Sequence, residues 1–406
     1  MKILMVCQHF YPEQFRINDI CFELALRGHE VTVLTGLPNY PEGRVFPGYH
    51  AKAKRDETVR GVRIIRTFLI GQGTNVLTLG LNYLTFIISS VLKAKRLAGP
   101  FDLVYSYQLS PISMVWPAIT VKKRFGIPLI LHCLDQWPVS LTAGPFRKDT
   151  AVYRWFEKIS IRTYRAADVI LLSSRSFRKY FETELGITAE EKGLIYYPSY
   201  AESDYDNVGS EDNGVFDLVF AGNIGPAQSV ETIIECAGYL RERRDIHFHI
   251  VGDGLSCAKC RKLAEEMQLT NVTFHGFHPV SDMPAYYRLA DAFLITMVDN
   301  EVVNSTLPAK IQSYMLAGKP IFGAIGGEVA DVVKEAGCGL CTGAYDAKGL
   351  ADLIASRSGD ASSLKEMGEK GRAYYLRHFE KETCIRALEE IFASAAAKKT
   401  AAEEAK

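Results

Sequence analysis

The chain has 406 residues, and its 47 basic side chains balance its 47 acidic ones, so its formal net charge is zero. Hydrophobic residues make up 48% of the sequence, which is enough to bury large cores and excludes a chain that is disordered throughout. The balanced charge argues against a protein that coats nucleic acid, because such proteins draw most of their affinity from a basic excess. The length indicates two or three domains of about 100–200 residues each.

The sequence begins with MKILMVC, in which the apolar run is too short for a secretory signal. We therefore expect a cytoplasmic protein whose nine cysteines are reduced thiols, most of them packed in the core. Two CxxC pairs, Cys257 with Cys260 and Cys338 with Cys341, would bind zinc together only if they met in space. Neither pair has turn glycines on both sides, so we favour packed thiols.

Short apolar runs alternate with helical patterns through the first half of the chain. The strands are expected at residues 2–7, 30–35, 62–67, 103–107, 128–132 and 168–172. The helices are expected at residues 17–27, 79–97, 113–125 and 153–166, and Gly28 ends the first of them. Such alternation is typical of a parallel sheet that is covered by helices on both faces.

Residues 76–92, with the sequence VLTLGLNYLTFIISSVL, carry no charge and are followed by Lys93, Lys95 and Arg96. The stretch lies at the lower limit for a membrane span, which needs about 17–25 residues, and it contains several Ser, Thr and Asn side chains. A buried helix of the α/β domain is the plainer interpretation. The alternative is a helix at a membrane surface whose basic end contacts anionic headgroups.

The second half repeats the alternation after a polar linker at residues 198–215. The strands are expected at residues 216–221, 246–251, 272–275, 291–296 and 320–324, and the helices at 230–241, 257–267, 283–289, 308–317 and 384–392. We predict two doubly wound, Rossmann-like domains at residues 1–200 and 213–380, with a C-terminal helix at about 380–406 that packs on the first. Open α/β sheets bind ligands at the carboxyl ends of their strands, so we expect a central cleft between two such edges.

The stretch NSTLPAKIQSYMLAGKP at residues 304–320 has N-cap residue types before Pro308 and a helix stop at Gly318. Free N–H groups at the start of a helix favour an anion. Lys310 lies in the expected first turn, where the helix dipole disfavours a cation unless a phosphate lies in front of it. We therefore interpret Lys310 as a phosphate-binding residue rather than an ordinary solvated lysine.

Three glycine-bearing turns follow strands of the second half: AGNIG at residues 221–225, GDG at 252–254 and GGE at 326–328. Small residues let backbone N–H groups approach a diphosphate. No GxGxxG opens a first βαβ unit, and no GxxxxGK[ST] occurs, which disfavours a nicotinamide-dependent oxidoreductase and excludes a standard P-loop.

Several motifs in order along the chain resemble the family 4 glycosyltransferases, retaining enzymes of GT-B architecture that use nucleotide-sugar donors. RGHEVTVLT at residues 27–35 is typical of the first domain of that family. PNYPEGRVFPGY at 38–49 and DQWP at 135–138 resemble the branch that acts in bacterial surface-polysaccharide synthesis, including fucosamine transferases. FAGNIGPAQSVETII, IVGDG, VTFHGFHP and LPAKIQSYMLAGKPI follow the same branch in the second half.

The resemblance implies that the second domain binds the donor, which we expect to be a UDP-sugar. The places of the family's diphosphate-binding Arg and Lys hold Asn223 and Gln228, so Lys310 is the expected replacement cation. The family's Glu-x7-Glu pair falls at Ser305 and Ser313, and both glutamates are therefore absent.

The second glutamate of that pair holds the ribose hydroxyls in the family, so we expect Gln312 or Glu328 to compensate for Ser313. The base is expected near Gly276. The other donor-binding candidates follow strands or precede helices, and they are Gly222, Gly225, Gly252, Asp253, Gly254, Phe277, His278, Thr306, Leu307, Gly326 and Gly327.

In the first domain Asp135 follows a predicted strand, and the same position lies in the DQWP motif. We expect it to bind sugar hydroxyls or to act as a base, in preference to a plain capping role. His132, at the end of that strand, is a second catalytic candidate with a packed histidine as the alternative. The acceptor-binding candidates lie on the loops after the first two strands, and they are Tyr11, Glu13, Gln14, Arg16, Asn39, Tyr40, Glu42 and Arg44.

The resemblance implies transfer of a hexosyl or N-acetylhexosaminyl group to a glycan or a lipid-linked saccharide, with no metal or other cofactor. A membrane surface is an expected partner through residues 76–96, which would place the protein peripherally at the inner face of the membrane. Two other functions stay open. One is a nucleotide-sugar 2-epimerase of the same architecture, and the other is a nucleotide-sugar-binding protein that has lost catalysis.

Overall fold

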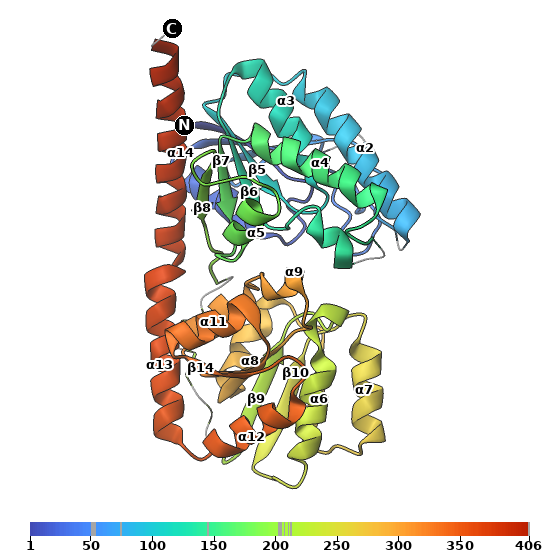
Figure 1. Ribbon diagram of the computed structural model, residues 1–406, viewed down its shortest axis with the longest axis vertical. Helices are drawn as coiled ribbons and strands as arrows, with labels where there is room; N and C mark the ends of the chain where they lie inside the picture. The colour runs from blue at the N-terminus through green and yellow to red at the C-terminus, as the bar shows by residue number, and fades with distance from the viewer. Residues whose placement is uncertain are drawn as a thin grey trace. The chain divides into compact units, whose positions relative to one another are not determined.

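The computed structural model describes residues 1–49, 54–73, 75–143, 146–201, 205–206, 208–209, 211 and 213–404 (Figure 1). The chain divides into two compact units. Unit 1 consists of Met1–Tyr197 together with Ile385–Lys406, and unit 2 is Pro198–Cys384. The division follows Tyr197, where the predicted polar linker begins, and six residues of that linker (202–204, 207, 210 and 212) lie outside the described residues.

Unit 1 is built on a sheet with the strand order β3-β4-β2-β1-β5-β6-β7-β8. All neighbouring strands are parallel except β3 and β4, which are antiparallel. The strands are β1 (Lys2–Val6), β2 (Glu30–Thr35), β3 (Asp56–Val59), β4 (Val62–Arg66), β5 (Leu103–Gln108), β6 (Leu129–Cys133), β7 (Val169–Leu172) and β8 (Gly193–Tyr196). Every residue of β5 and β6 is buried, as expected for strands that helices cover on both faces.

The helices of unit 1 are α1 (Arg16–Leu26), α2 (Val76–Ala94), α3 (Trp116–Phe125), α4 (Ala151–Ala166) and α5 (Phe177–Thr183). The last helix, α14 (Lys381–Glu404), returns from the end of the chain to this unit. Glu389 of α14 lies 2.8 Å from His29 Nε2 and accepts a hydrogen bond from Arg27 at 3.2 Å. Phe392 is fully buried, and its ring lies 5.6 Å from that of Tyr105 in β5.

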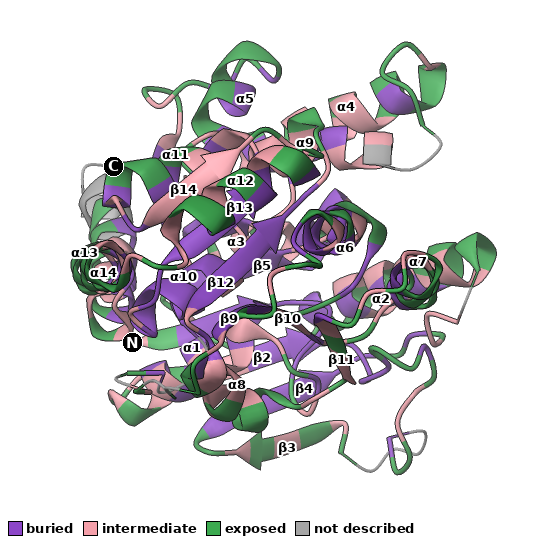
Figure 2. Ribbon diagram, turned by 90° about the horizontal axis from the view of Figure 1, so that it is seen from below, coloured by how far each residue is buried: buried purple, intermediate pink, exposed green. Residues whose placement is uncertain are grey.

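Unit 2 has a fully parallel sheet with the strand order β11-β10-β9-β12-β13-β14. The strands are β9 (Phe216–Ala221), β10 (Ile246–Val251), β11 (Val272–Gly276), β12 (Ala292–Thr296), β13 (Ile321–Ala324) and β14 (Gly339–Thr342). The helices are α6 (Val230–Tyr239), α7 (Cys257–Glu266), α8 (Met283–Leu289), α9 (Glu301–Asn304), α10 (Lys310–Leu316), α11 (Gly327–Ala336), α12 (Ala347–Arg357) and α13 (Ala361–His378). Figure 2 shows the central strands β9 and β12 as buried ribbon, with the edge strand β11 less covered.

Both sheets confirm the α/β prediction, because nearly all strands run parallel with helical connections between them. The sequence patterns missed β3, α5, β8 and β14, which are all short, and the helices α9, α11, α12 and α13. Glycines and polar residues break the apolar periodicity in the missed helices; α13, for example, reads ASSLKEMGEKGRAYYLRH. Neighbouring elements, rather than local pattern, hold these segments in place.

The expectation that residues 76–92 form a buried helix is wrong for most of their side chains. Helix α2 buries Asn82, Phe86, Ser90 and Ala94, and its leucines and Ile88 are exposed or only partly covered. The buried face is therefore the more polar one. The helix is long and apolar enough to cross a membrane by length and composition.

Candidate functional site

The glycine turns of unit 2 meet where β9 and β10 end. Gly222 has φ 140° and Gly252 has φ 139°, and a Cβ added to Gly252 would lie 1.8 Å from the Gly222 carbonyl oxygen. A Cβ on Gly254 would lie 2.5 Å from Asn223 Oδ1. Only glycine allows the two turns to pack this closely, so the expected grouping at the carboxyl ends of the strands is what the structure shows.

The Lys310 side chain reaches across this edge from the start of α10. Its Nζ donates to Gln228 Oε1 at 2.8 Å and lies 4.1 Å from the centre of the Phe220 ring. A Cβ on Gly222 would lie 3.0 Å from the same Nζ. The structure therefore brings together Lys310, Gln228 and the Gly222 turn, which are three of the donor-binding candidates.

Burial lowers the pKa of Lys310 to about 7. Among the residues that the structure describes, the contacts of Nζ are an amide oxygen and an aromatic face, and no carboxylate is among them. A cation that is desolvated without an anionic partner is suited to receive an anion from outside. The geometry thus favours binding of a phosphate-bearing ligand next to the Gly222 turn.

The predicted capping of the Lys310 helix is wrong. Asn300 caps the short helix α9 by accepting a hydrogen bond from Val303 N–H at 2.9 Å, and Ser305 and Thr306 follow at its end. The Ser305 and Thr306 hydroxyls both donate to the Val302 carbonyl, and the Thr306 N–H donates to the Val303 carbonyl. Helix α10 begins at Lys310 without a side-chain cap, so Ser305 and Thr306 complete α9 instead of holding an anion at α10.

The Gly326-Gly327 turn lies against the end of α9. Gly327 has φ 64°, and a Cβ there would lie 2.1 Å from the Asn304 carbonyl oxygen. This contact joins the start of α11, at the carboxyl end of β13, to the segment that precedes Leu307 and Lys310. A Cβ on Gly326 would meet no other heavy atom within 4 Å.

The residues proposed to replace the missing glutamates are buried. Gln312 is fully buried, and its amide lies 3.0 Å from the Pro308 carbonyl and 3.1 Å from that of Ala309. Its amide is thus engaged within its own helix, which contradicts the expectation that it holds a ribose. Ser313 and Glu328 are 5% and 4% exposed, so only small parts of their surfaces remain for a ligand.

The edge near β11 carries an exposed aromatic residue. Phe277 follows Gly276 directly at the end of the strand, and 76% of its surface is exposed. His278 is held by Tyr286, whose hydroxyl lies 2.8 Å from Nε2, and by Asp282 at 3.3 Å from Nδ1. An exposed ring beside the turn is suited to stack on a nucleobase, which agrees with the position expected for the base.

In unit 1, Asp135 lies just after β6 and beside the end of β5. Ser110 Oγ donates to Asp135 Oδ2 at 2.8 Å, and Trp137 Nε1 donates to the same Ser110 hydroxyl at 2.9 Å. Burial raises the pKa of Asp135, while the Ser110 hydrogen bond lowers it. This partly buried carboxylate at the carboxyl edge of the sheet has the environment of a functional acid.

The structure contradicts a catalytic role for His132. Its ring is 4% exposed and lies among the rings of Tyr105, Tyr107 and Tyr197. Nδ1 lies 2.6 Å from the Tyr105 hydroxyl, and burial lowers the pKa of His132 to about 3. The side chain therefore stays neutral and belongs to the core.

Two of the predicted acceptor-binding residues instead hold the loops together. The Glu13 carboxylate accepts hydrogen bonds from the N–H groups of Phe10, Asn39 and Tyr40, and Glu13 is only 2% exposed. Asn39 is fully buried, and its amide bonds the backbone of Leu37 and Gln72 as well as Asn82. Glu13 and Asn39 are therefore positioning residues, which corrects the expectation that they bind the acceptor.

The other loop candidates keep accessible surface. Tyr11, Gln14, Tyr40, Glu42 and Arg44 are exposed, and Arg16 is partly buried. Tyr40 lies next to the Glu13 clamp, which fixes its backbone N–H at 2.7 Å from Oε1. These residues offer hydroxyl, amide, carboxylate and guanidinium groups on one edge of the unit 1 sheet, next to the ends of β1 and β2.

Sequence reasoning missed His9, which lies between the end of β1 and Glu13. His9 Nδ1 lies 3.0 Å from Glu13 Oε1, and the imidazole ring stacks on Phe15 with a centroid distance of 5.0 Å. A carboxylate at Nδ1 fixes the ring and makes Nε2 the proton-accepting nitrogen. The spacing of His9 and Glu13 in the loop QHFYPEQF is the signal that could have identified the pair.

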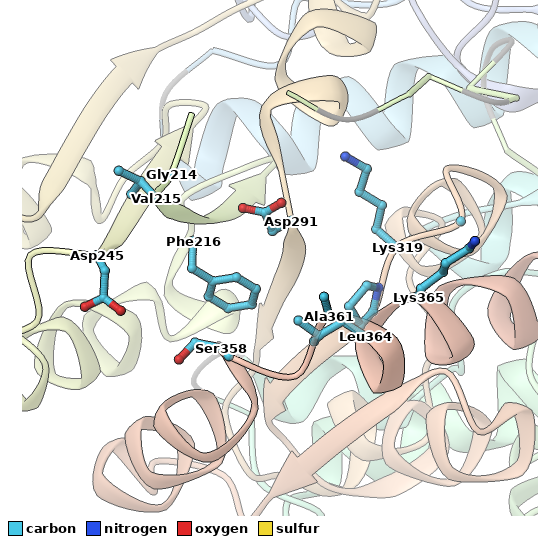
Figure 3. Close-up of a pocket in the computed structure, with 13 residues that line it drawn as sticks. Gly214, Val215, Phe216, Asp245, Asp291, Lys319, Ser358, Ala361, Leu364 and Lys365 are labelled. Atoms are coloured by element: carbon cyan, nitrogen blue, oxygen red, sulfur yellow. The ribbon is translucent and has the colours of Figure 1, made fainter. Parts of the chain in front are cut away.

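A cavity of about 490 Å³ opens at the other edge of the unit 2 sheet, at the amino ends of β9, β12 and β13 (Figure 3). Phe216, Asp291 and Lys319 line it. Lys319 Nζ donates to the carbonyls of Arg288 and Ala290, and burial lowers its pKa to about 8. This lysine ties down the end of α8, so the cavity is separate from the glycine turns and does not belong to the candidate site.

Among the residues that the structure describes, no group of three or more His, Cys, Asp or Glu side chains is placed to hold a metal ion. All nine cysteines are free thiols. Cys257 and Cys260 are buried on α7, whereas Cys338 and Cys341 lie on either side of the start of β14. Burial raises the pKa of Cys260, Cys338 and Cys341 to about 12, so these thiols remain protonated.

The sequence matches two family profiles that together extend over both units. The profile described as glycosyl transferase 4-like domain matches residues 14–197, and the one described as glycosyl transferases group 1 matches residues 203–374. The chain is also 27% identical over 345 residues to WcaI of Escherichia coli K12, which is named provisionally as a colanic acid biosynthesis glycosyl transferase. That match covers 78% of this chain and 82% of WcaI.

Solved structures share the fold over almost the whole chain. HepE of Anabaena, solved in complex with UDP and glucose, is 17% identical with a TM-score of 0.69, and the match covers 97% of this chain and 100% of HepE. Sucrose-phosphate synthase of Thermosynechococcus elongatus is 15% identical with a TM-score of 0.73, and the match covers 98% of this chain and 99% of the synthase chain. Both profile matches and these likenesses agree with the two parallel sheets and their glycine turns, and the chain therefore belongs to the group 1, or family 4, glycosyltransferases of GT-B fold.

Proposed function

We propose that the chain transfers a hexosyl or N-acetylhexosaminyl group from a UDP-sugar to a hydroxyl of a saccharide acceptor, with retention of configuration, in the synthesis of a surface polysaccharide. The observation that carries this proposal is the position of Lys310. Its partly buried ammonium group lies next to the Gly222 turn, without a carboxylate partner in the described part of the chain, at the edge where open α/β sheets bind ligands. The complex of HepE with UDP and the name of WcaI support the donor class and the pathway.

Unit 2 binds the donor in this proposal. The diphosphate lies against the Gly222, Gly252 and Gly326-Gly327 turns, with Lys310 as its cation, and the base stacks on Phe277. As the bond from the anomeric carbon to the diphosphate oxygen breaks, its electron pair moves to the diphosphate. Lys310 stabilises the negative charge that develops there, which is the term that contributes most to such reactions.

Unit 1 binds the acceptor and supplies the polar groups around its hydroxyl. The acceptor oxygen forms the new bond on the face from which the diphosphate leaves, and its proton passes to a diphosphate oxygen. Asp135 accepts a hydrogen bond from a sugar hydroxyl, and His9, oriented by Glu13, contacts the acceptor beside Tyr40. The reaction requires no metal in this scheme, because Lys310 provides the charge, and we expect transfer to survive a chelating agent.

The decisive experiment compares the wild-type protein with Lys310→Met in transfer from a panel of UDP-sugars to saccharide acceptors. Loss of one group that stabilises the developing charge reduces kcat by about 100-fold to 1,000-fold. Lys262→Met is the matched control, because Lys262 is an exposed lysine on α7. Unchanged turnover by Lys310→Met would contradict the assigned role. Anomeric configuration of the product, measured by NMR, tests retention.

A second function is favoured by one feature, the serines at the two glutamate positions. Ser305 is bonded within α9 and Ser313 is almost fully buried, so neither replaces a carboxylate. A protein that only binds nucleotide-sugars would be stabilised by a UDP-sugar in thermal unfolding but would release no UDP with any acceptor. Release of UDP without an acceptor, with a changed configuration at sugar carbon 2, would indicate an epimerase instead.

A further inference from the structure

The outer face of α2 is an apolar row that no element covers among the residues that the structure describes. Leu77, Leu81, Leu84, Ile88 and Leu92 follow one another at helical spacing, and between 38% and 75% of each is exposed. Figure 1 shows α2 at the edge of unit 1, beyond α3. A soluble helix ordinarily turns its apolar face to the core, and α2 does the reverse. We call these five residues the outer row.

The inner face explains why α2 lies on the unit rather than leaving it. The Asn82 amide donates to the Ile70 carbonyl at 2.6 Å and accepts from Gln8 Nε2 at 2.6 Å, while Ser89 Oγ donates to the Phe68 carbonyl at 2.5 Å. A helix that crossed a bilayer would lose these hydrogen bonds and place the polar groups in hydrocarbon. The structure thus favours a helix that lies in a membrane surface.

The charged side chains within residues 76–96 are all basic. Lys93, Lys95 and Arg96 are exposed where the outer row ends, and residues 76–96 contain no Asp or Glu. Arg124 of α3 donates to the carbonyls of Ala94 and Leu97, which adds a fourth cation at this end of the helix. An apolar row with a cationic end is the pattern that binds anionic headgroups while the leucines enter the acyl boundary.

We propose that the outer row and its basic end, Lys93 to Arg96, dock unit 1 on an anionic lipid membrane with the axis of α2 along the surface. A second copy of the chain is the weaker occupant, because the same residues 76–96 of that copy contain no acidic group to pair with the cations. Docking of this kind needs no substrate, so it stands independently of the proposed transfer.

A consequence that does rest on the proposed function concerns the acceptor. Asn82 on the inner face donates to Asn39 Oδ1 at 3.2 Å, so α2 is joined to the loop that carries Tyr40 and the Glu13 clamp. Tyr83 of α2 also lies near Asp135. Burial of the Tyr83 phenol raises its pKa, and the negative charge of Asp135 raises it further. A membrane under α2 would therefore lie beside the acceptor loops, which favours an acceptor attached to a lipid.

The test is flotation of the full chain with vesicles of phosphatidylcholine, with and without phosphatidylglycerol, in the absence of donor and acceptor. We expect binding to the anionic vesicles only. Leu84→Glu with Ile88→Glu should abolish it, and Lys93→Gln, Lys95→Gln and Arg96→Gln together should weaken it by roughly 100-fold. Leu26→Glu with Leu255→Glu is the matched control, since both leucines are exposed and neither belongs to α2, so binding should be unchanged.

Circular dichroism and thermal unfolding establish that each variant is folded, which is expected because the changed side chains are at least half exposed or lie on the surface. Wild-type protein that does not float, or glutamate variants that float as well as wild type, would overturn the proposal. So would a dimer in light scattering that Leu84→Glu with Ile88→Glu converts to monomer without any vesicle binding. Transfer to a water-soluble saccharide is measured separately, so failure of the proposed function leaves the flotation result intact.

Discussion

At the scale of single residues, burial moves two opposite charges of the candidate site toward their neutral forms. It lowers the pKa of Lys310 to about 7 and raises that of Asp135. Each group has a polar neighbour that holds its position, Gln228 for the lysine and Ser110 for the aspartate. Burial therefore makes the charged form of each group less favourable than it is in water.

We predict that a UDP-sugar takes up close to one proton on binding at about pH 8. Lys310 is mostly neutral there, because its pKa is about 7, and the diphosphate favours the protonated form. At about pH 6 the lysine is already protonated before the UDP-sugar binds, so the proton uptake on binding should vanish. Calorimetry in two buffers of different ionisation enthalpy measures the protons exchanged. Uptake that persists in Lys310→Met would show that another group is responsible.

A second prediction concerns the acid limb of the rate profile. Ionised Asp135 is the form that accepts a hydrogen bond from a sugar, so the transfer rate should fall as pH falls through its pKa. Ser110→Ala removes the hydrogen bond that lowers this pKa, so the limb should move to higher pH. Asp135→Asn should remove the limb and reduce the rate by about 100-fold or more. A Ser110→Ala profile that matches wild type would mean that Asp135 does not set the limb.

At the scale of elements, glycines decide how closely the segments of unit 2 approach. Gly252 packs on the Gly222 carbonyl, and Gly368 of α13 packs on that of Gly318, where a Cβ would lie 2.0 Å away. Such contacts let α13 cover the end of α10 and let the two turns form one ligand edge. They also explain why α13 forms despite glycines that disfavour a helix interior.

We predict that Gly252→Ala destabilises the protein by more than about 1 kcal/mol, because its φ of 139° and the nearby Gly222 carbonyl both exclude a methyl group. It should also weaken UDP-sugar binding, since the Gly222 turn must move. Gly343→Ala is the control, because Gly343 lies beyond β14 and a Cβ there would meet no other atom within 4 Å. The urea unfolding midpoint of the Gly343→Ala protein should therefore match that of the wild type. Equal midpoints for both variants would argue against the close packing.

At the scale of the whole molecule, the last helix completes a unit that the first part of the chain began. Ile385, Leu388 and Phe392 are buried in unit 1, more than 180 residues after its last strand ends at Tyr196. Glu389 adds contacts with Arg27 and His29 at the amino edge of the same sheet. Unit 1 therefore depends on both ends of the chain.

We predict that Phe392→Ala lowers the free energy of unfolding by about 3–5 kcal/mol, because it empties a fully buried site beside Tyr105. Phe277→Ala makes the same change at an exposed residue and should leave the urea midpoint nearly unchanged. The Phe277→Ala variant should instead lose affinity for UDP-sugars if the Phe277 ring of the wild type stacks on the base. A midpoint for Phe392→Ala equal to wild type would show that α14 does not stabilise the unit.

The amino-acid sequence by itself determined the alternation of strands and helices, the placement of the glycine turns after strands of the second half, and the family, through several motifs in order along the chain. The alternation and the placement of the turns follow from hydrophobic period, turn glycines and the rule that parallel strands bring their carboxyl ends to one edge, whereas the family follows from the resemblance of the motifs. Only the tertiary structure decided that His132 and Gln312 are core residues, that Glu13 and Asn39 clamp loops, and that α2 turns its leucines outward. The physical reason is that burial and hydrogen-bond partners depend on segments distant in the chain, such as Tyr105 for His132 and Gln8 for Asn82, which no local pattern records.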